Sequence, residues 1–369
     1  MNSSRKGTGR PSVLLDMRPL QGPSAGRGIG AYARGLLGGL VAAGFDNHLS
    51  LLLDVAYDEP AMPPGRYRLV GSRRRSHGQL AAYEDAVALT ADIRRLGPDV
   101  YHAIDLHLPG SSPCPLAVTL HDLIPWAWGG PRMRGERLRN LAAFRLLRRA
   151  DAVIAVSEAT AGDAMGLHVA SRNRLRVIPE AADPVFRPRE GATRRVREKW
   201  NIQGAYILYV GALDARKDPT SLLEAWATAR KTRPELELVI AGDPGRQAPR
   251  AMNGAIQVGR VADEELADLY SAAACFVFPS RYEGFGLPCL EAMSCACPVA
   301  AFRNSSIPEV VGDAGMLVAD GDAAALGEAA AAMIGQRERW SRAGLQRARK
   351  FSWERVAKET ISVYEALLA

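Results

Sequence analysis

The chain has 369 residues, of which 47% are hydrophobic and 24% charged, which predicts a soluble globular protein of two domains. No run reaches the ~18–20 apolar residues that a membrane span needs. Residues 1–11 are polar and basic and have no apolar core, which excludes a secretory signal there and predicts a disordered tail. The net charge of +7 and the five cysteines point to no particular partner, because no nucleic-acid-binding motif and no metal-ligand spacing accompany them. We therefore predict no nucleic acid, no metal site and no cofactor, with the cysteines reduced in a cytoplasmic protein.

The first half begins with an expected strand at 12–17, a glycine-rich loop that ends at Gly28 and Gly30, and an amphipathic helix at 31–43. A strand, a glycine turn and a helix are a weak indication of a phosphate site. No acidic residue follows at a second strand end in a convincing context, which disfavours a nicotinamide site.

Further strands are predicted at 49–55, 99–103, 115–120, 151–156 and 175–178, with a helix at 83–96 and Ser157 as the N-cap of another. His121 and Asp122 follow the strand at 115–120 directly. Polar residues at the carboxyl end of a buried strand lie where α/β folds bind ligands. This position makes His121 a candidate site residue and Asp122 a weaker one.

An arginine-rich segment, 132–149, carries apolar residues at helical spacing from about Gly135 onward. Two interpretations stay open at this point. The segment is either an ordinary amphipathic helix with a solvated arginine face, or a surface for anionic lipid or a phosphorylated acceptor.

The second half restarts with a strand at 205–210, the turn glycine Gly211, the basic pair Arg216 and Lys217, and a helix at 220–230. A cationic pair just after a strand is suited to a diphosphate. Strands at 236–241 and 256–261 follow, the second ending in Gly259, Arg260 and Val261, and then a helix with Asp263 as its expected N-cap.

The most informative stretch is 275–299. It predicts a buried strand at 275–278, a glycine loop, and a helix that opens at Leu287. The exposed amides of such a helix start favour negative charge. Two carboxylates, Glu283 and Glu291, frame the loop with seven residues between them. The segment carries the sequence EGFGLPCLEAM. Amides for a phosphate together with carboxylates for neutral hydroxyls describe a nucleotide-sugar site.

This glutamate spacing closely resembles the signature of the family 4 retaining glycosyltransferases of GT-B fold, and HDL at 121–123 and the basic pair at 216–217 resemble further family motifs. The resemblance implies an α/β protein with two Rossmann-like domains facing across a cleft, and a C-terminal helix crossing back to the first domain. The expected division is a tail at 1–11, an acceptor domain at 12–180, a linker at 181–204, a donor domain at 205–350 and the returning helix at 351–369.

The resemblance also implies roles for single residues. Catalytic roles fall to His121, Arg216, Lys217 and Glu283, with Lys217 and Arg216 on the departing diphosphate and Glu283 on a sugar hydroxyl. Glu291 is expected to hold the ribose. Donor binding is further assigned to Gly28, Gly30, Gly211, Gly259, Arg260, Val261, Gly284, Phe285, Gly286 and Leu287. The family often has a second basic residue at the position of Ala212, and Arg216 is expected to replace it.

The implied activity is transfer of a sugar, with mannose favoured, from a nucleoside-diphosphate sugar to an acceptor hydroxyl with retention. Within the family, the sequence most resembles bacterial mannosyltransferase-like members. This resemblance makes GDP-mannose the favoured donor and implies a surface glycan or a lipid-linked molecule as the acceptor. On the lipid-binding interpretation of the arginine-rich segment, an anionic membrane surface would be a further partner and would place a cytoplasmic protein at the inner face of the membrane. The alternatives are a GT-B-fold epimerase acting on nucleotide sugars and a non-catalytic nucleotide-sugar-binding subunit.

Overall fold

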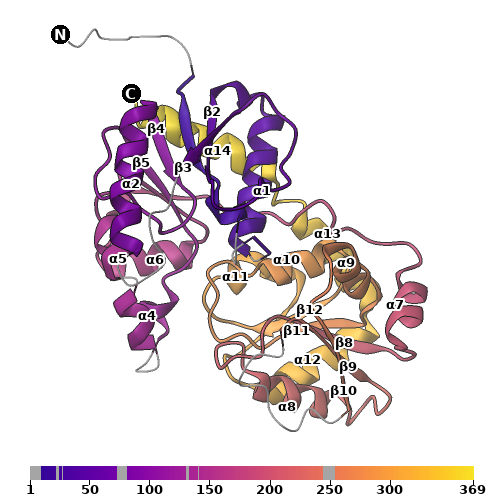
Figure 1. Ribbon diagram of the computed structural model, residues 1–369. Coiled ribbons are helices and arrows are strands. Elements are labelled where there is room, and N and C mark those ends of the chain that lie inside the picture. The colour runs from indigo at the N-terminus through magenta and orange to yellow at the C-terminus, as the bar shows by residue number, and fades with distance from the viewer. Residues whose placement is uncertain are drawn as a thin grey trace, which may run out of the picture. The chain divides into compact units, whose positions relative to one another are not determined.

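A computed structural model describes residues 10–21, 25–26, 28–72, 81–129, 133–139, 141–243 and 254–369 (Figure 1). Most of the expected tail lies outside the described residues, as do Gly22 and Arg27 of the glycine-rich loop and Arg132 of the arginine-rich segment. The chain divides into two compact units, one of Met1–Pro179 with Trp353–Ala369 and the other of Glu180–Ser352.

The first unit is built on a seven-stranded sheet in the order β3-β2-β1-β4-β5-β6-β7, with every neighbouring pair parallel. The chain enters in the middle and winds to one edge and then to the other, which is the order of a Rossmann fold. The strands are β1 Val13–Asp16, β2 Leu49–Asp54, β3 Arg68–Ser72, β4 Val100–Ala103, β5 Leu116–Leu120, β6 Ala152–Ala155 and β7 Leu175–Val177.

The helices of this unit connect the strands or follow the second unit in the chain. They are α1 Gly28–Ala42, α2 Ala81–Leu96, α3 Ile124–Ala127, α4 Arg134–Arg139, α5 Leu141–Leu147, α6 Glu158–Gly166 and α14 Trp353–Ala366. Ser157 is the N-cap of α6, as predicted, with its hydroxyl accepting from the Thr160 amide at 3.0 Å.

The second unit repeats this architecture with six parallel strands in the order β10-β9-β8-β11-β12-β13. The strands are β8 Tyr206–Val210, β9 Glu237–Ala241, β10 Ala255–Gly259, β11 Cys275–Phe278, β12 Val299–Phe302 and β13 Met316–Val318. The helices are α7 Ala192–Trp200, α8 Pro219–Ala229, α9 Asp263–Ala272, α10 Leu287–Ser294, α11 Ile307–Val311, α12 Ala323–Gly335 and α13 Arg337–Ala348.

Each sheet lies within its own apolar core. Leu14, Val118 and Val153 belong to the core of the first unit, while Leu238 and Val277 belong to that of the second. Strands buried on both faces require such continuous apolar runs, which is why most of them could be read from the sequence. The prediction of two Rossmann-like parallel-sheet domains is confirmed.

Several local expectations were wrong. Helix α1 begins at Gly28, so Gly28 and Gly30 belong to its first turn and do not form a loop. Burial of Tyr32, Leu36 and Leu40 along one side of α1 outweighs the low helix propensity of glycine. The residue at the N-cap of α9 is Ala262, with its amide donating to the Glu265 carboxylate at 3.2 Å, and Asp263 is the first helical residue.

The arginine-rich segment contains the helices α4 and α5, on either side of Asn140, which lies outside the described residues. The stretch expected as a linker contains helix α7 and groups with the second unit.

Helix α14 packs against α1 in the first unit, and two glycines of α1 make the contact close. A Cβ built on Gly35 would lie 2.0 Å from the Trp353 ring, and one on Gly39 would lie 2.3 Å from the Trp353 carbonyl oxygen. Neither distance leaves space for a methyl group. The start of α14 therefore depends on these two positions having no side chain.

We expect Gly39→Ala to lower the free energy of unfolding of the first unit by about 1–3 kcal/mol, because a backbone atom cannot move aside as a side chain can. Gly38→Ala is the matched control, since a Cβ there meets only Pro63, at 3.7 Å. Alanine at an unobstructed helical position should stabilise by up to about 1 kcal/mol. Urea unfolding of both variants measures the difference, and equal effects would contradict the close packing.

Candidate active site

The basic pair lies on the turn that follows β8. Gly211 opens the turn with a φ of +142°, a conformation that side-chain-bearing residues rarely adopt. One Asp214 carboxylate oxygen accepts from the amides of Arg216 and Lys217, each at 3.0 Å. This aspartate was not predicted as a site residue, and it fixes the backbone that carries both cations.

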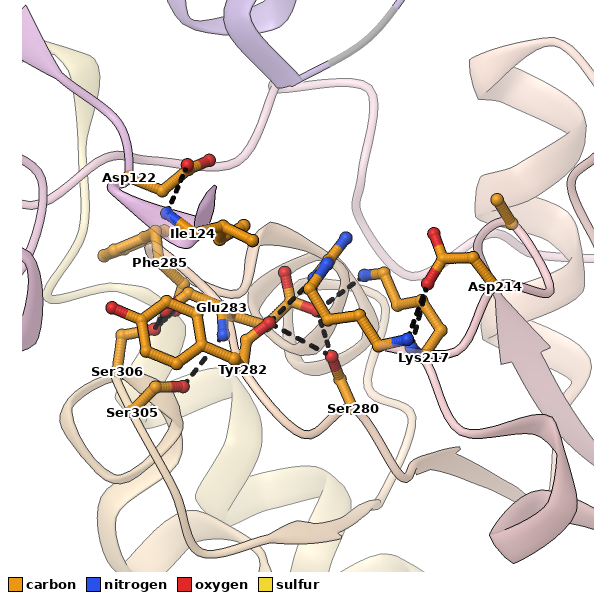
Figure 2. A network of polar contacts seen from close by, with 12 residues as sticks. Asp122, Ile124, Asp214, Lys217, Ser280, Tyr282, Glu283, Phe285, Ser305 and Ser306 are labelled. Atoms are coloured by element: carbon orange, nitrogen blue, oxygen red, sulfur yellow. Dashed lines mark hydrogen bonds and ion pairs between the residues drawn. The ribbon is translucent and has the colours of Figure 1, made fainter. Parts of the chain in front are cut away.

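The carboxylate of Glu283, on the loop after β11, meets both cations. The same oxygen, Oε1, accepts from Lys217 Nζ at 2.6 Å and from Arg216 Nη1 at 2.9 Å, and the Ser280 hydroxyl also donates to it (Figure 2). Arg216 Nη1 also contacts the Tyr282 carbonyl at 2.7 Å. Two strands that are neighbours in the sheet thus bring together residues 66 positions apart.

The charges of this cluster are mutually dependent. Burial alone would raise the pKa of Glu283, but the charges of Lys217 and Arg216, with the hydrogen bonds from Lys217 and Ser280, hold that pKa below its ordinary value. The carboxylate is therefore ionised at neutral pH. The Lys217 ammonium also lies 4.7 Å from the centre of the Phe278 ring, a cation–π contact.

Three polar residues after β12 brace the loop that carries Glu283. Ser305 Oγ accepts from the Glu283 amide at 2.9 Å, and the buried Ser306 hydroxyl lies 2.7 Å from the Phe285 carbonyl and 3.1 Å from the Glu283 carbonyl (Figure 2). Asn304 Nδ2 donates to the Ser280 carbonyl at 2.9 Å. No role was predicted for this triplet, although polar residues directly after a buried strand are a detectable signal.

The expected amide donors lie where the loop enters α10. Gly284 and Phe285 are buried, Gly286 is the N-cap, and Leu287 is the first helical residue, as the sequence predicted. Gly286 has a φ of +104°, and a Cβ there would lie 2.7 Å from the Ile307 side chain. Only glycine suits this turn, which directs the start of α10 toward the Glu283 loop.

Glu291 lies on α10 and is half-buried, with the Tyr270 hydroxyl donating to its Oε2 at 3.1 Å. Burial, together with the charges of Asp263 and Asp183, raises the pKa of Glu291 to about 7, although the Tyr270 hydrogen bond acts to lower it. This carboxyl group therefore titrates near neutral pH, unlike Glu283.

The remaining residues of the second unit that the sequence assigned to donor binding lie at the end of β10 and just after it. Gly259 ends the strand with a φ of +71°, and Arg260 and Val261 come next. The Gly259 carbonyl accepts from the Gly242 amide at 2.8 Å, and Gly211 donates to the Ala241 carbonyl at 2.9 Å. These bonds join the carboxyl ends of β8, β9 and β10 into one edge.

His121 lies in the first unit, at the end of β5. Its Nε2 is 3.0 Å from the Ile104 carbonyl, and since a carbonyl only accepts, Nε2 carries a proton. Asp122 accepts from the Ile124 amide at 3.1 Å and so supports the start of α3 (Figure 2). Gly28 and Gly30 lie in the same unit, in the first turn of α1.

Within the second unit the structure therefore brings Arg216, Lys217 and Glu283 into direct contact, with Gly211 beside Lys217 and Gly284 next to Glu283. His121, Asp122, Gly28 and Gly30 belong to the first unit. Among the described residues, no three His, Cys, Asp or Glu side chains are grouped as metal ligands would be. In the same part of the chain, no helix combines the length and the apolar character that a membrane span requires.

Two family models match the chain. The model of "Glycosyltransferase Family 4" matches residues 26–186 and that of "Glycosyl transferases group 1" matches residues 204–336, together more than half of the chain.

Curated relatives include bacterial mannosyltransferases. The O-antigen chain mannosyltransferase B of Escherichia coli is 29% identical over 96% of this chain and 100% of its own length. The MMP alpha-(1->4)-mannosyltransferase of Mycolicibacterium hassiacum is 33% identical over 61% of this chain, which spans 56% of that protein. The serotype-specific mannosyltransferase WbdA of Escherichia coli is 26% identical over 81% of this chain and 41% of its own length.

Solved structures share the fold. The sucrose-phosphate synthase of Thermosynechococcus elongatus has a TM-score of 0.77 with 23% identity, covering 97% of this chain and 99% of that one. Anabaena Alr3699/HepE in complex with UDP and glucose has a TM-score of 0.72 with 17% identity, covering 96% and 100%. The two family models, the mannosyltransferase relatives and the two parallel-sheet units lead to one conclusion: the chain belongs to the family 4 glycosyltransferases, enzymes of GT-B fold.

Proposed function

We propose that this glycosyltransferase is a retaining mannosyltransferase that moves mannose from GDP-mannose to an acceptor hydroxyl of a surface glycan or glycolipid. The observation that carries the proposal is the pair of cations, Lys217 and Arg216, that share a single carboxylate oxygen of Glu283. Two cations side by side on one turn suit the two phosphates of a diphosphate.

The proposed chemistry follows from where charge develops. As the bond from the sugar to the diphosphate breaks, negative charge grows on the leaving phosphate, and cations already in place stabilise it more than they stabilise the bound donor. Lys217 and Arg216 take this role, and no metal ion is required for it. Glu283 accepts from a hydroxyl of the sugar, and His121 contacts the transferred sugar.

The donor's base and sugar are proposed from the relatives. Mannosyltransferases such as the Escherichia coli O-antigen enzyme favour mannose and hence GDP-mannose. The solved Alr3699/HepE structures contain UDP and UDP-glucose, which makes a uridine donor the second candidate. In this proposal Gly259, Arg260 and Val261 meet the base, Glu291 meets the ribose, and amides from Gly284 to Leu287 meet the sugar and phosphates, with Gly28, Gly30 and Gly211 also near the donor.

The proposal is tested with GDP-mannose, UDP-glucose and the Lys217→Ala variant. We expect slow release of GDP from GDP-mannose without acceptor, faster release with a mannan acceptor, and no loss of activity after chelation. Lys217→Ala should lower kcat about 100–1000-fold, as loss of one oxyanion contact does elsewhere, while the donor Kd changes less. Calorimetry supplies the Kd of the folded variant.

Three results would contradict parts of this proposal. If the enzyme turns over UDP-glucose and not GDP-mannose, the proposed donor is wrong. If it produces an epimerised nucleotide sugar and releases no nucleotide, the proposed transfer reaction is wrong and the enzyme is an epimerase. Equal losses in Kd and kcat in Lys217→Ala would mean that this cation only binds the ground state.

Glu291 makes donor affinity depend on pH. Its pKa of about 7 means that the group is largely protonated at pH 6, and ribose hydroxyls donate to the carboxylate form. The donor therefore lowers this pKa on binding. Its affinity should fall as pH drops below 7, by up to about tenfold per pH unit, and should level off above pH 8.

The measurement is calorimetric titration with intact GDP-mannose, because free GDP has a terminal phosphate that titrates in the same range. Glu291→Gln is the matched control, since it keeps the size of the side chain and does not titrate. Its affinity should be lower at pH 8 and should not change between pH 6 and 8. The same slope in both proteins would exclude Glu291 as the ribose acceptor.

We also propose that the enzyme acts at the inner face of an anionic membrane, through α4, α5 and the residues before them. Leu138 is 75% exposed, and Trp126 and Phe144 stack with ring centres 4.5 Å apart. Arg145 and Arg148 are exposed on α5 and just after it. Trp126 and Phe144 are partly buried, and the exposed apolar residues are Leu138 and Trp128. Exposed apolar groups near arginines are typical of a surface that binds lipid headgroups.

Co-sedimentation with vesicles that contain anionic lipid tests this proposal. Each arginine near such a surface contributes about 1 kcal/mol, so Arg145→Gln with Arg148→Gln should weaken partitioning about 30-fold, and salt should weaken it further. The control double variant, Arg194→Gln with Arg197→Gln, removes the same charge from α7. Equal losses in both variants would indicate attraction by net charge alone, and binding to neutral vesicles would exclude the electrostatic mechanism.

A further inference from the structure

Four buried side chains of the first unit form a continuous chain of hydrogen bonds. Tyr364 Oη of α14 lies 2.6 Å from His102 Nδ1 of β4, and His102 Nε2 lies 2.9 Å from Thr119 Oγ1 of β5. Thr119 Oγ1 in turn lies 3.2 Å from Tyr32 Oη of α1. All four residues are fully buried. Two helices and two strands are thus connected through one polar path within an apolar core.

The protonation state of His102 makes the hydrogen bonds of this path depend on one another. Burial lowers the pKa of His102 to about 3, so the ring is neutral, with one nitrogen that donates and one that accepts. If Tyr364 donates to Nδ1, then Nε2 donates to Thr119; if Thr119 donates to Nε2, then Nδ1 donates to Tyr364. In either case each group depends on the orientation of the next, because an unpaired polar atom is costly at this depth.

The path ends at a ring that touches His121. Tyr32 and His121 meet edge to face, with ring centres 4.8 Å apart and an angle of 87° between the planes. Tyr32 also meets Trp353, the first residue of α14, in an edge contact at 5.7 Å. His121 is thus held from two sides, by the Tyr32 ring and by the Ile104 carbonyl that accepts from Nε2.

We propose that Tyr32 is a positioning residue for His121, and that the path through Thr119 and His102 makes the orientation of the His121 ring depend on the docked helix α14. The Ile104 carbonyl selects the tautomer with the proton on Nε2, and the Tyr32 ring restricts rotation of the imidazole plane. The Tyr32 hydroxyl, anchored on Thr119, keeps the ring in that place. The proposal rests on the proposed function only in that it expects His121 to take part in sugar transfer.

Two variants separate the ring of Tyr32 from its hydroxyl. Tyr32→Leu removes the edge contact, whereas Tyr32→Phe keeps the ring and cuts the path at Thr119. Tyr364→Phe cuts the same path at its far end without touching His121. Tyr206→Phe is the matched control, because its buried hydroxyl bonds to the Leu269 carbonyl, at 2.7 Å, in the second unit.

The decisive readout is the nitrogen NMR spectrum of histidine-labelled protein, with the His121 signals assigned by their loss in His121→Gln. We expect the Nε2–H tautomer in the unsubstituted enzyme and in Tyr206→Phe, and a mixture of tautomers in Tyr32→Leu. Tyr32→Phe and Tyr364→Phe should shift the His121 signals by less. In the transfer assay, kcat should fall at least tenfold in Tyr32→Leu and about threefold in the two phenylalanine variants, with the KM for the donor within twofold.

An unchanged His121 spectrum in folded Tyr32→Leu would overturn the positioning role. If that variant does not fold, Tyr364→Phe decides, because an unaltered spectrum and unaltered kcat there would remove the dependence on α14. Full activity of His121→Ala would refute the catalytic role of His121. The spectra would still show whether Tyr32 orients its ring, so the two failures are distinguishable.

Discussion

Burying charge is costly unless the charge is paired, and this constraint organises the candidate site. Glu283 lies among buried groups and is ionised because Lys217 and Arg216 both contact it. Removing either cation leaves the carboxylate with one cation and the Ser280 hydroxyl, and removing the carboxylate leaves two cations side by side. The three charges therefore form one unit, and a bound diphosphate would be an additional partner for cations that are already in place.

The topology of the sheet makes this unit possible. In the order β10-β9-β8-β11-β12-β13, the order in which strands are added reverses between β8 and β11. The basic pair follows β8, and Glu283 follows β11. The point where strand order reverses is where open α/β sheets bind ligands, because the two loops there diverge and leave room. The third loop, after β12, supplies Ser305 and Ser306, which fix the backbone of the Glu283 loop.

The sequence predicted those parts of the site that depend only on residues close to one another in the chain. The bounds 275–278 and the start of α10 at Leu287 agree with the structure, because an apolar run, a glycine turn and a proline at the second helical position define them within a few residues. The contact between Lys217 and Glu283 could not be predicted in this way. It depends on strand order, and each residue had been assigned to a different part of the donor.

Other omissions have the same origin. Strands β3 and β13 are edge strands, with a neighbouring strand on one side only. Less of each strand is therefore buried, so Arg68 and Leu69 are exposed and the alternation of apolar and polar residues in the sequence is weak. The start of α1 at Gly28 is a result of packing, which overrides propensity. Ser306 can be noticed in the sequence only by its position after β12, and its importance comes from the carbonyls of Glu283 and Phe285 that it contacts.

Helix α14 has a consequence for the order in which the chain folds during synthesis. The second unit is continuous, whereas the first is completed by residues that follow the second in the chain. Until those residues leave the ribosome, the nascent first unit lacks the Tyr364 hydroxyl for His102, and the surface of α1 at Gly35 and Gly39 has no cover. The second unit has all its residues at an earlier stage, so a translation product truncated before Trp353 would contain one complete unit and one with an open core.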